Sequence, residues 1–433
     1  MKKILILAFC FCAFLSTAQN LYFPPVLGNT WETVSPQTSM NWCTPKMDSL
    51  KQFLTTKSTK AFIVFKDGRI AVEWYFGTFT QDSAWYWASA GKSLTSFLAG
   101  MAQQDGILNI QDSTSKYLGK GWTSLTAAQE GKIKVVHQLS MSTGLDDGVP
   151  NDNCTTPQCL TYKADAGTRW AYHNAPYHLV HDVIEKASGL TINQYTNQKL
   201  YAKTGITGLW ADHIFYSKPR SAARFGLLAL ANGVWNGERI LRDTAYWRTS
   251  INTSQPMNKS YGYLWWLNGK AEYMLPQIRL VYQGSIVDSA PNDMYAALGK
   301  NDQKIYVVPS QNMVVVRMGD ASGIPLYALS NFDNELWLKL SKMTCTSSNQ
   351  DIEYQDISVS PNPVSDVLQL NLSENDLNTE GGVFITTVLG QVYDLGHIKR
   401  QINTTTLPNG LYFLTIKTKT KQYKAKILIQ HPY

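Results

Sequence analysis

The chain has 433 residues, of which 44% are hydrophobic and 16% are charged, a composition typical of globular proteins. This length exceeds what usually folds around a single hydrophobic core. Its net charge of +7 at pH 7 is modest, and its Lys and Arg residues form no block or stripe of the kind that binds nucleic acid. More than one domain is therefore expected, and a nucleic-acid-binding function is disfavoured.

The first 18 residues are typical of a secretory signal peptide. Lys2 and Lys3 supply its charged start, Ile4 to Leu15 its apolar segment, and Ser16-Thr17-Ala18 a small-residue cleavage site. The apolar segment is too short to span a bilayer, which takes about 20 residues, and no later stretch is long and apolar enough. We therefore expect the mature chain to be exported and to have no transmembrane segment.

Cysteine usage agrees with an oxidising compartment. Two of the six cysteines lie in the leader, which leaves Cys43, Cys154, Cys159 and Cys345. An even number of cysteines outside the cell favours disulfides, and Cys154 and Cys159 close a small loop. No histidine stands at ligand spacing from these cysteines, so we expect neither a metal site nor a cofactor.

Two elements precede the most informative motif. Residues 41–55 have helical periodicity, with Met47 and Leu50 on one apolar stripe. The apolar runs 61–65 and 70–76 are separated by Lys66-Asp67-Gly68-Arg69, a pattern typical of a β-hairpin. A helix followed by a hairpin predicts a sheet with helices packed against it.

The central motif is Ser89-Ala90-Gly91-Lys92, which is followed by the apolar run from Leu94 to Met101. If Ser89 opens a helix, its spacing from Lys92 puts both side chains on one face. A serine hydroxyl needs a neighbouring base to act as a nucleophile, and a lysine can be that base where burial keeps its amine neutral. The apolar flanks of this motif favour such burial.

The Ser-x-x-Lys pattern alone is a weak signal, because the chain contains a second copy, Ser113-Thr114-Ser115-Lys116. It lies in the polar stretch 111–116, with no apolar helix beginning at its serine. We interpret Ser113 as part of a solvated loop.

The segment from Ile133 to Leu145 contains His137, a residue type that can serve as a catalytic base. Because His137 stands among apolar residues at core spacing, we interpret it as structural.

Further along, Gly167-Thr168-Arg169-Trp170-Ala171-Tyr172-His173-Asn174 leads into a helix expected from Pro176 to Lys186 and closed by Gly189. Tyr172 and Asn174 are thereby placed in a turn at the start of a helix, and a phenol there could pass a proton to a leaving group. A second Tyr-x-Asn, beginning at Tyr195, falls inside a helix expected over 192–200 and is interpreted as ordinary surface.

These motifs, taken in order, resemble the serine β-lactamase-related family. The resemblance is carried by Ser89-x-x-Lys92, the segment 137–145 and Gly167-Thr168-Arg169-x-x-Tyr172-x-Asn174, and it covers roughly residues 50–340. The family joins class C β-lactamases, D-Ala-D-Ala carboxypeptidases, and related esterases and small-amide hydrolases. The resemblance implies a mixed α/β fold, an antiparallel sheet flanked by helices, together with an all-helical subdomain.

The resemblance also implies roles for individual residues. Ser89 would be the acylated nucleophile, Lys92 its general base and Tyr172 the proton relay. In the family the first and last helices of this domain pack side by side, which implies a disulfide between Cys43 and Cys345.

One motif departs from the family pattern. The strand that lines the site usually carries Lys-Thr-Gly or His-x-Gly, whereas the corresponding stretch here is Ala297-Leu298-Gly299-Lys300. In β-lactamases and carboxypeptidases those side chains hold the substrate carboxylate, so their absence argues against penicillin-like substrates. The candidate substrate-binding or oxyanion groups are Asn174 and a backbone amide among Leu298, Gly299 and Lys300, together with the amide of Ser89.

The tail predicts a separate domain. Residues 346–356 are polar and linker-like, and residues 357–433 alternate as the strands of a small all-β sandwich. This segment resembles the C-terminal sorting domain of type IX secretion substrates, while a carbohydrate-binding or adhesive β-module is the alternative. The predicted organisation is therefore a signal peptide over 1–18, a serine hydrolase domain over 19–345, a linker over 346–356 and a sorting domain over 357–433.

The leading hypothesis is a secreted or cell-surface serine hydrolase that acts on ester or small amide bonds and meets the type IX secretion machinery through its tail. The first alternative is a β-lactamase or D-Ala-D-Ala carboxypeptidase. The second is a binding protein on the same scaffold that has lost catalysis.

Overall fold

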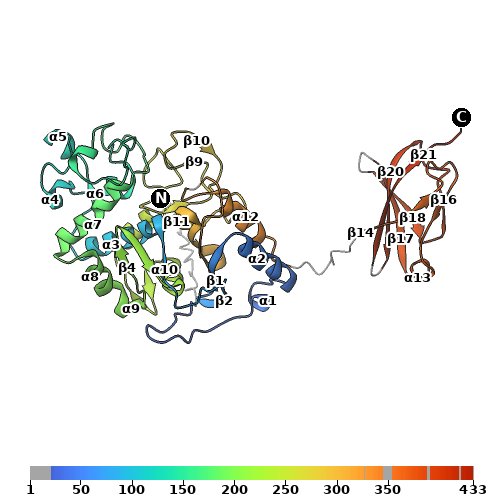
Figure 1. Ribbon diagram of the computed structural model, residues 1–433, viewed down its shortest axis with the longest axis horizontal. Helices are drawn as coiled ribbons and strands as arrows, with labels where there is room; N and C mark the ends of the chain where they lie inside the picture. The colour runs from blue at the N-terminus through green and yellow to red at the C-terminus, as the bar shows by residue number, and fades with distance from the viewer. Residues whose placement is uncertain (1–20, 326, 345–353, 388–390, 419–420, 433) are drawn as a thin grey trace, which may run out of the picture. The chain divides into compact units, whose positions relative to one another are not determined.

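The computed structural model describes residues 21–325, 327–344, 354–387, 391–418 and 421–432. The chain forms two compact units that divide between Thr344 and Cys345 (Figure 1). The predicted signal peptide and most of the predicted linker lie outside the described residues. Within the described ranges, no helix has both the length and the apolar character needed to cross a membrane.

A six-stranded antiparallel sheet forms the centre of the larger unit. Its strand order is β2-β1-β13-β12-β11-β8. The predicted hairpin is present as β1 (Thr59–Lys66) and β2 (Arg69–Tyr75), and its turn uses Gly68 at a φ of 82°. The remaining strands are β8 (Trp266–Leu267), β11 (Tyr295–Gly299), β12 (Gln303–Val308) and β13 (Met313–Gly319).

Helices cover both faces of this sheet (Figure 1). On one face α10 (Pro219–Leu230) approaches so closely that a Cβ on Gly226 would lie 3.0 Å from Ile305 Cγ2. On the other face the Tyr306 hydroxyl donates to Asp333 Oδ1 of α12 (Asn331–Leu340) at 2.7 Å. Successive strand residues point to opposite faces, so α10 and α12 lie on opposite sides of β12. The helix α2 (Thr44–Thr56) packs beside α12.

A buried charged cluster ties α12 to the sheet. The Lys304 side chain has no exposed surface, and its Nζ lies 2.7 Å from Asp333 Oδ2 and 3.3 Å from Asp302 Oδ1. Asp302 Oδ2 in turn accepts from the Ser322 and Gly323 N–H groups, each at 2.9 Å. This cluster therefore fixes the start of the loop that follows β13.

The predicted helical subdomain lies between β3 (Trp85–Tyr86) and β4 (Leu209–Ala211) in the sequence. Within it, the helix α3 (Gly91–Gln104) contacts α7 (Asn174–Ser188), with 2.8 Å between Thr95 Oγ1 and His181 Nε2. Gly189 follows α7 with a φ of 73°, which confirms the predicted C-terminal cap. The other helices are α4 (Ser115–Leu118), α5 (Ala127–Glu130), α6 (Val135–Leu139), α8 (Ile192–Thr196) and α9 (Ala202–Thr204).

Shorter elements complete the larger unit. They are α1 (Pro36–Ser39), β3 (Trp85–Tyr86), β4 (Leu209–Ala211), β5 (Ile214–Ser217), β6 (Val234–Trp235), β7 (Glu238–Arg239), α11 (Thr244–Ser250), β9 (Glu272–Met274) and β10 (Val281–Gln283).

Two local predictions are wrong. Ser113 is not in a solvated loop, because its Oγ is buried and its backbone bridges to Lys134. Tyr195 is not ordinary surface, since it is 1% exposed, and the expected helix divides into α8 and a π-helical turn over Asn197–Tyr201. In each case packing against neighbouring segments overrides the local pattern.

The smaller unit consists mainly of strands, as predicted. One sheet has the order β14-β21-β20-β17-β18 and the other has the order β15-β16-β19. Along β20 buried and more exposed residues alternate, because one face of the strand packs on the core. The elements are β14 (Tyr354–Asp356), β15 (Val359–Ser360), β16 (Val367–Leu370), α13 (Glu374–Leu377), β17 (Gly381–Thr387), β18 (Val392–His397), β19 (Gln401–Asn403), β20 (Gly410–Thr418) and β21 (Gln422–Ile429).

Candidate active site

Ser89 lies in a tight turn, the 3-10 helix Ala88–Ala90, that leads directly into α3. The turn begins with Ala88 in the left-handed region at a φ of 47°, which is strained for a residue with a Cβ. It is held by Trp87, whose backbone N–H donates to Phe215 O and whose indole N–H donates to Ser217 Oγ, both at 2.8 Å. The anchored turn presents Ser89 at the N-terminal end of α3.

Lys92 is the buried base candidate. Its side chain points back toward Ser89, with 3.0 Å between Lys92 Nζ and Ser89 Oγ, and the residue is only 3% exposed. Nζ also donates to Asn174 Oδ1 at 2.9 Å and lies 4.2 Å from the centroid of the Tyr177 ring. Burial lowers the pKa of Lys92 to about 7, against a smaller opposing effect from the charge of Asp152. A substantial fraction of the amine is therefore neutral at neutral pH.

Tyr172 and Asn174 reach the same place from the start of α7. Tyr172 is 7% exposed, and its ring stacks on Trp266 with 5.9 Å between centroids. Burial raises the pKa of Tyr172 well above its usual value, while a hydrogen bond with Ser89 lowers it and the charge of Asp152 raises it. The phenol is accordingly protonated at neutral pH and lies within reach of the Ser89 hydroxyl.

The end of β11 lies against the Ser89 turn. A Cβ on Gly299 would stand 2.4 Å from Trp87 O and 3.0 Å from Ala90 N, so only glycine allows this approach. Leu298 and Gly299 are buried, whereas Lys300 is exposed and lines the cavity in front of Ser89. Of these three residues, Lys300 is therefore the one that lines the open space.

That space is a cavity of about 740 Å³. Its wall includes Ser89, Lys92, Tyr172 and Asn174, together with residues of the disulfide loop, the β4–β5 turn, and positions 276–277 and 327–328. The structure thus brings together the predicted nucleophile, base, relay and Asn174. The size suits a small molecule.

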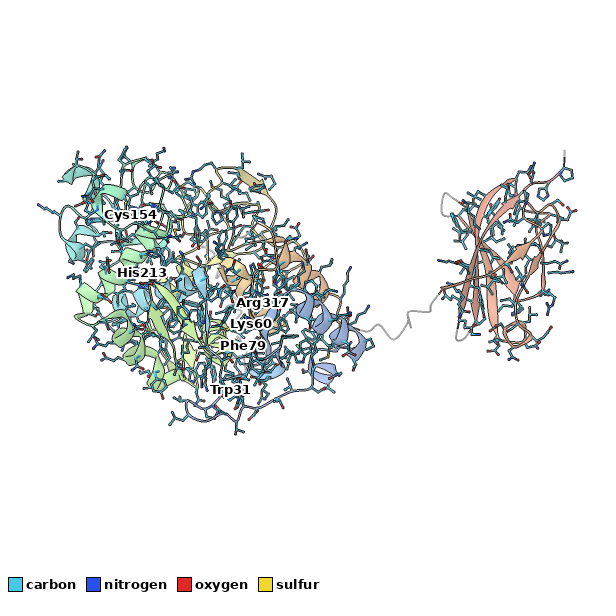
Figure 2. The ribbon with its side chains drawn as sticks, viewed as in Figure 1. Trp31, Lys60, Phe79, Cys154, His213 and Arg317 are labelled. Carbon is cyan, nitrogen blue, oxygen red and sulfur yellow. A yellow bond between two sulfur atoms is a disulfide. The ribbon has the colours of Figure 1, made fainter. Side chains whose placement is uncertain are left out.

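Two histidines that the sequence patterns did not indicate form part of the wall. His178 of α7 and His213 of the β4–β5 turn stack with 4.2 Å between ring centroids (Figure 2 labels His213). Burial lowers the pKa of His178 to about 3 and also lowers that of His213. Among the described residues no group of His, Cys, Asp and Glu side chains is arranged to hold a metal ion.

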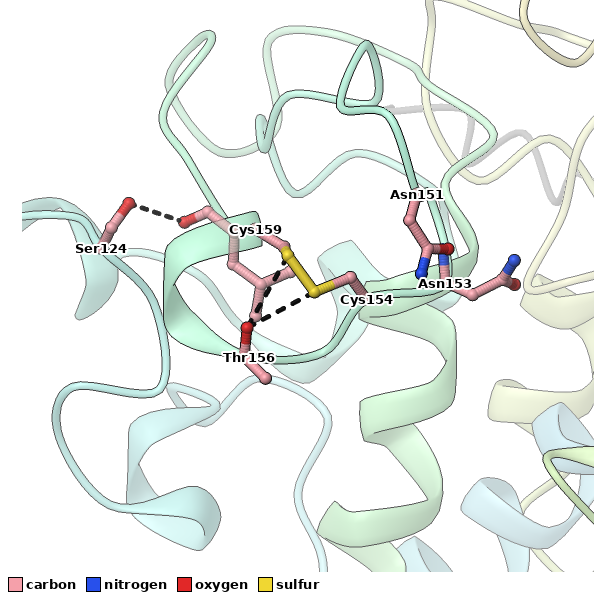
Figure 3. Close-up of a disulfide and its surroundings, with 7 residues drawn as sticks. Ser124, Asn151, Asn153, Cys154, Thr156 and Cys159 are labelled. Atoms are coloured by element: carbon pink, nitrogen blue, oxygen red, sulfur yellow. Dashed lines mark hydrogen bonds between the residues drawn. A yellow bond between two sulfur atoms is a disulfide. The ribbon is translucent and has the colours of Figure 1, made fainter.

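The disulfide between Cys154 and Cys159 is present, with 5.8 Å between the Cα atoms (Figure 3). Thr155 within the closed loop, and Asp152 and Asn153 directly before it, line the cavity, a role that the cysteine spacing did not indicate. The predicted partner of Cys43, Cys345, lies outside the described residues, so that pairing stays a prediction.

His137 lies apart from these groups. Its Nδ1 accepts from the Lys134 N–H at 3.1 Å at the start of α6, which is a structural contact of the kind that was expected.

The antiparallel sheet and the helical subdomain, with the Ser89, Lys92 and Tyr172 side chains between them, form a β-lactamase/transpeptidase-like α/β fold. Residues 56–214 match the Beta-lactamase family model, and residues 358–430 match the model of the secretion system C-terminal sorting domain. A Beta-lactamase model thus matches part of the larger unit, and a sorting-domain model that indicates export through a secretion system matches most of the smaller unit.

Solved structures support the fold of the larger unit. A protein from Bacillus anthracis assigned as a 6-aminohexanoate-dimer hydrolase is 16% identical with a TM-score of 0.54, covering 75% of this chain and 88% of its own. A protein from Bacteroides dorei assigned as a β-lactamase is 18% identical with a TM-score of 0.55, covering 70% and 99%. A family VIII carboxylesterase is 11% identical with a TM-score of 0.53, covering 70% and 98%.

Proposed function

We propose that this protein is an exported serine hydrolase that cleaves ester or small amide bonds through an acyl-enzyme on Ser89. The observation that carries the proposal is the buried contact between Lys92 Nζ and Ser89 Oγ at 3.0 Å, with a lysine pKa of about 7. A base with a pKa close to the working pH combines the correct protonation state with useful basicity.

In the acylation step, neutral Lys92 takes the proton from the Ser89 hydroxyl as Oγ attacks the carbonyl carbon of the substrate. The carbonyl oxygen becomes an oxyanion, which the backbone N–H groups of Ser89 and Lys300 stabilise at the N-terminal end of α3. The Tyr172 hydroxyl donates its proton to the leaving alcohol or amine and recovers one from Lys92. The C–O or C–N bond breaks, and the acyl group remains on Ser89.

Deacylation uses the same groups in reverse. A water molecule gives its proton toward Tyr172 and Lys92 while its oxygen attacks the acyl carbon, and Ser89 leaves with a proton. No other group is required for the overall hydrolysis.

The strand beside the site favours esters and small amides over penicillin-like substrates. Ala297 and Leu298, which stand where the family usually has Lys and Thr, are apolar and at most 1% exposed. The strand therefore offers no hydroxyl or ammonium group there for a substrate carboxylate.

The β-lactamase or D-Ala-D-Ala carboxypeptidase alternative retains one supporting observation. Lys300 follows the altered motif directly, is exposed and lines the cavity, so its ammonium could bind a carboxylate in place of the missing lysine. A binding protein without catalysis is disfavoured by the complete Ser89, Lys92 and Tyr172 set.

A substrate panel on the mature full-length chain separates these functions. p-Nitrophenyl esters of different acyl length, short linear amides and nitrocefin would be tested beside the Ser89→Ala variant as a matched control. Ester or amide turnover that is lost in Ser89→Ala supports the proposal. Turnover of nitrocefin alone would favour the β-lactamase alternative, and turnover of none would favour the binding protein.

A further inference from the structure

Behind Lys92, hydrogen bonds lead from the reacting serine to Asp152, in the segment directly before the disulfide-closed loop. Lys92 Nζ lies 2.9 Å from Asn174 Oδ1, and Asn174 Nδ2 donates to Asp152 Oδ2 at 3.0 Å. Asp152 also accepts the backbone N–H of Ala175 on its carbonyl oxygen at 2.8 Å. Asp152 therefore holds the first turn of α7 through both its side chain and its backbone.

The chemistry of this contact fixes which atom of Asn174 faces the base. A carboxylate only accepts hydrogen bonds, so Asp152 selects the Nδ2 group of Asn174 and turns Oδ1 toward Lys92. In this orientation a neutral Lys92 donates to Asn174 and keeps its lone pair for the proton of Ser89. With the amide reversed, Nδ2 would donate to that lone pair and occupy the base.

The disulfide begins two residues after Asp152. Asn153 Nδ2 donates to Asp152 Oδ1 at 3.1 Å, and the Cys154 N–H donates to Asn151 O at 3.1 Å (Figure 3 labels the two asparagines). The bond to Cys159 then closes the loop, and the next residue, Leu160, is fully buried. The loop is thus anchored two residues beyond Asp152.

We propose that Asp152 is a positioning residue for the Lys92 base and that the Cys154–Cys159 disulfide keeps it in place. This inference rests on the proposed function, because it requires Lys92 to act as the general base. Asp152 itself does not touch the substrate carbonyl or the reacting oxygen.

The charges around Lys92 set the sign of the expected pH effect. Asp152 is the acidic group whose charge acts on Lys92. The surrounding groups are the Tyr172 and Tyr177 phenols with raised pKa values, the His178, His181 and His213 rings with lowered pKa values, and Lys300 on the cavity wall. Removing the charge of Asp152 therefore lowers the pKa of Lys92, so that the acidic limb of activity moves to lower pH.

Two substitutions separate orientation from charge. Asp152→Ala removes both the acceptor that orients Asn174 and the negative charge. It should lower the plateau of kcat/KM by about tenfold to a hundredfold, as expected for a displaced catalytic group. Asp152→Asn keeps an oxygen acceptor, so its plateau should fall less while its acidic limb moves down by less than about one pH unit. Asp146→Asn is the matched control, because Asp146 binds Gly148 N–H and Lys163 in the same region without contacting Asn174.

The double variant Cys154→Ser/Cys159→Ser tests the second half of the proposal. It should lose activity in the same direction as Asp152→Ala, and combining the two changes should cost less than the product of their separate losses. Thermal unfolding checks that each variant folds. If Asp152→Ala does not fold, Asp152→Asn tests the role of Asp152 in its place.

Failure of this inference is distinguishable from failure of the proposed function. An active wild-type enzyme whose Asp152 variants keep both plateau and limb would overturn the inference alone, as would equal losses in Asp146→Asn. A wild-type enzyme that turns over no substrate and acquires no label at Ser89 would overturn the proposed function, and this inference with it.

Discussion

The acidic limb of the pH–rate profile should report the protonation of Lys92. The pKa of Lys92 falls from 10.5 to about 7, which corresponds to about 5 kcal/mol against the charged amine. At pH 7 about half of the molecules then carry a neutral base, compared with about three in ten thousand for an ordinary lysine. Because the base must be neutral to accept a proton, activity falls as the pH drops through the pKa.

The expected profile is a plateau in kcat/KM above about pH 8 and a fall with unit slope below about pH 7, which gives about tenfold less activity at pH 6 than at pH 8. Hydrolysis of a p-nitrophenyl ester, read at the isosbestic wavelength of p-nitrophenol, measures it. The rates of Ser89→Ala at each pH are subtracted as background.

A histidine near the site would be the obvious alternative source of an acidic limb near pH 7. Burial lowers the pKa of His173 to about 4 and that of His178 to about 3, so neither should titrate near pH 7. Lys92→Ala should lower kcat/KM by about three orders of magnitude or more. A rate independent of pH between 5 and 9, a limb near the ordinary lysine value, or an unchanged limb in Lys92→Ala would refute the reasoning.

Three further predictions follow from the same contacts. Tyr172→Phe removes the proton relay and should lower kcat by about two to four orders of magnitude in steady-state assays, with near-normal rates arguing against that role. Gly299→Ala places a Cβ 2.4 Å from Trp87 O and should lower the acylation rate by about tenfold or more in stopped-flow labelling. An unchanged acylation rate would mean that the end of β11 does not position the Ser89 turn. Asp333→Ala leaves buried Lys304 without its 2.7 Å partner and should cost about 3–5 kcal/mol in denaturant unfolding, so a loss below about 1 kcal/mol would contradict it.

The predictable parts of the site are those set by short-range sequence. Ser89 and Lys92 meet because they stand three positions apart at a helix start, and Cys154 and Cys159 meet because the loop between them is short. The hairpin and the Gly189 cap are likewise local signals. Such features require no knowledge of the tertiary fold.

The parts that sequence reasoning missed depend on contacts between distant segments. Asp152 reaches Asn174 only because the disulfide loop folds back on α7. His213 reaches His178 through a two-residue β4–β5 turn in which Asp212 and His213 have φ values of 47° and 62°, where turns of this kind usually have Asn-Gly. The proximity of Asp152 to Cys154 is a weak signal that could have directed attention to this loop.

The central claim, that Ser89 is the residue acylated, is tested most directly by covalent trapping. The mature full-length chain would be treated with a fluorophosphonate probe and the adduct mapped by peptide mass spectrometry, beside Ser89→Ala and a probe-free control. If Ser89 is the acylated nucleophile, the probe should form one stoichiometric adduct on Ser89 and none in Ser89→Ala. An adduct on another residue, or equal labelling of Ser89→Ala, would contradict it.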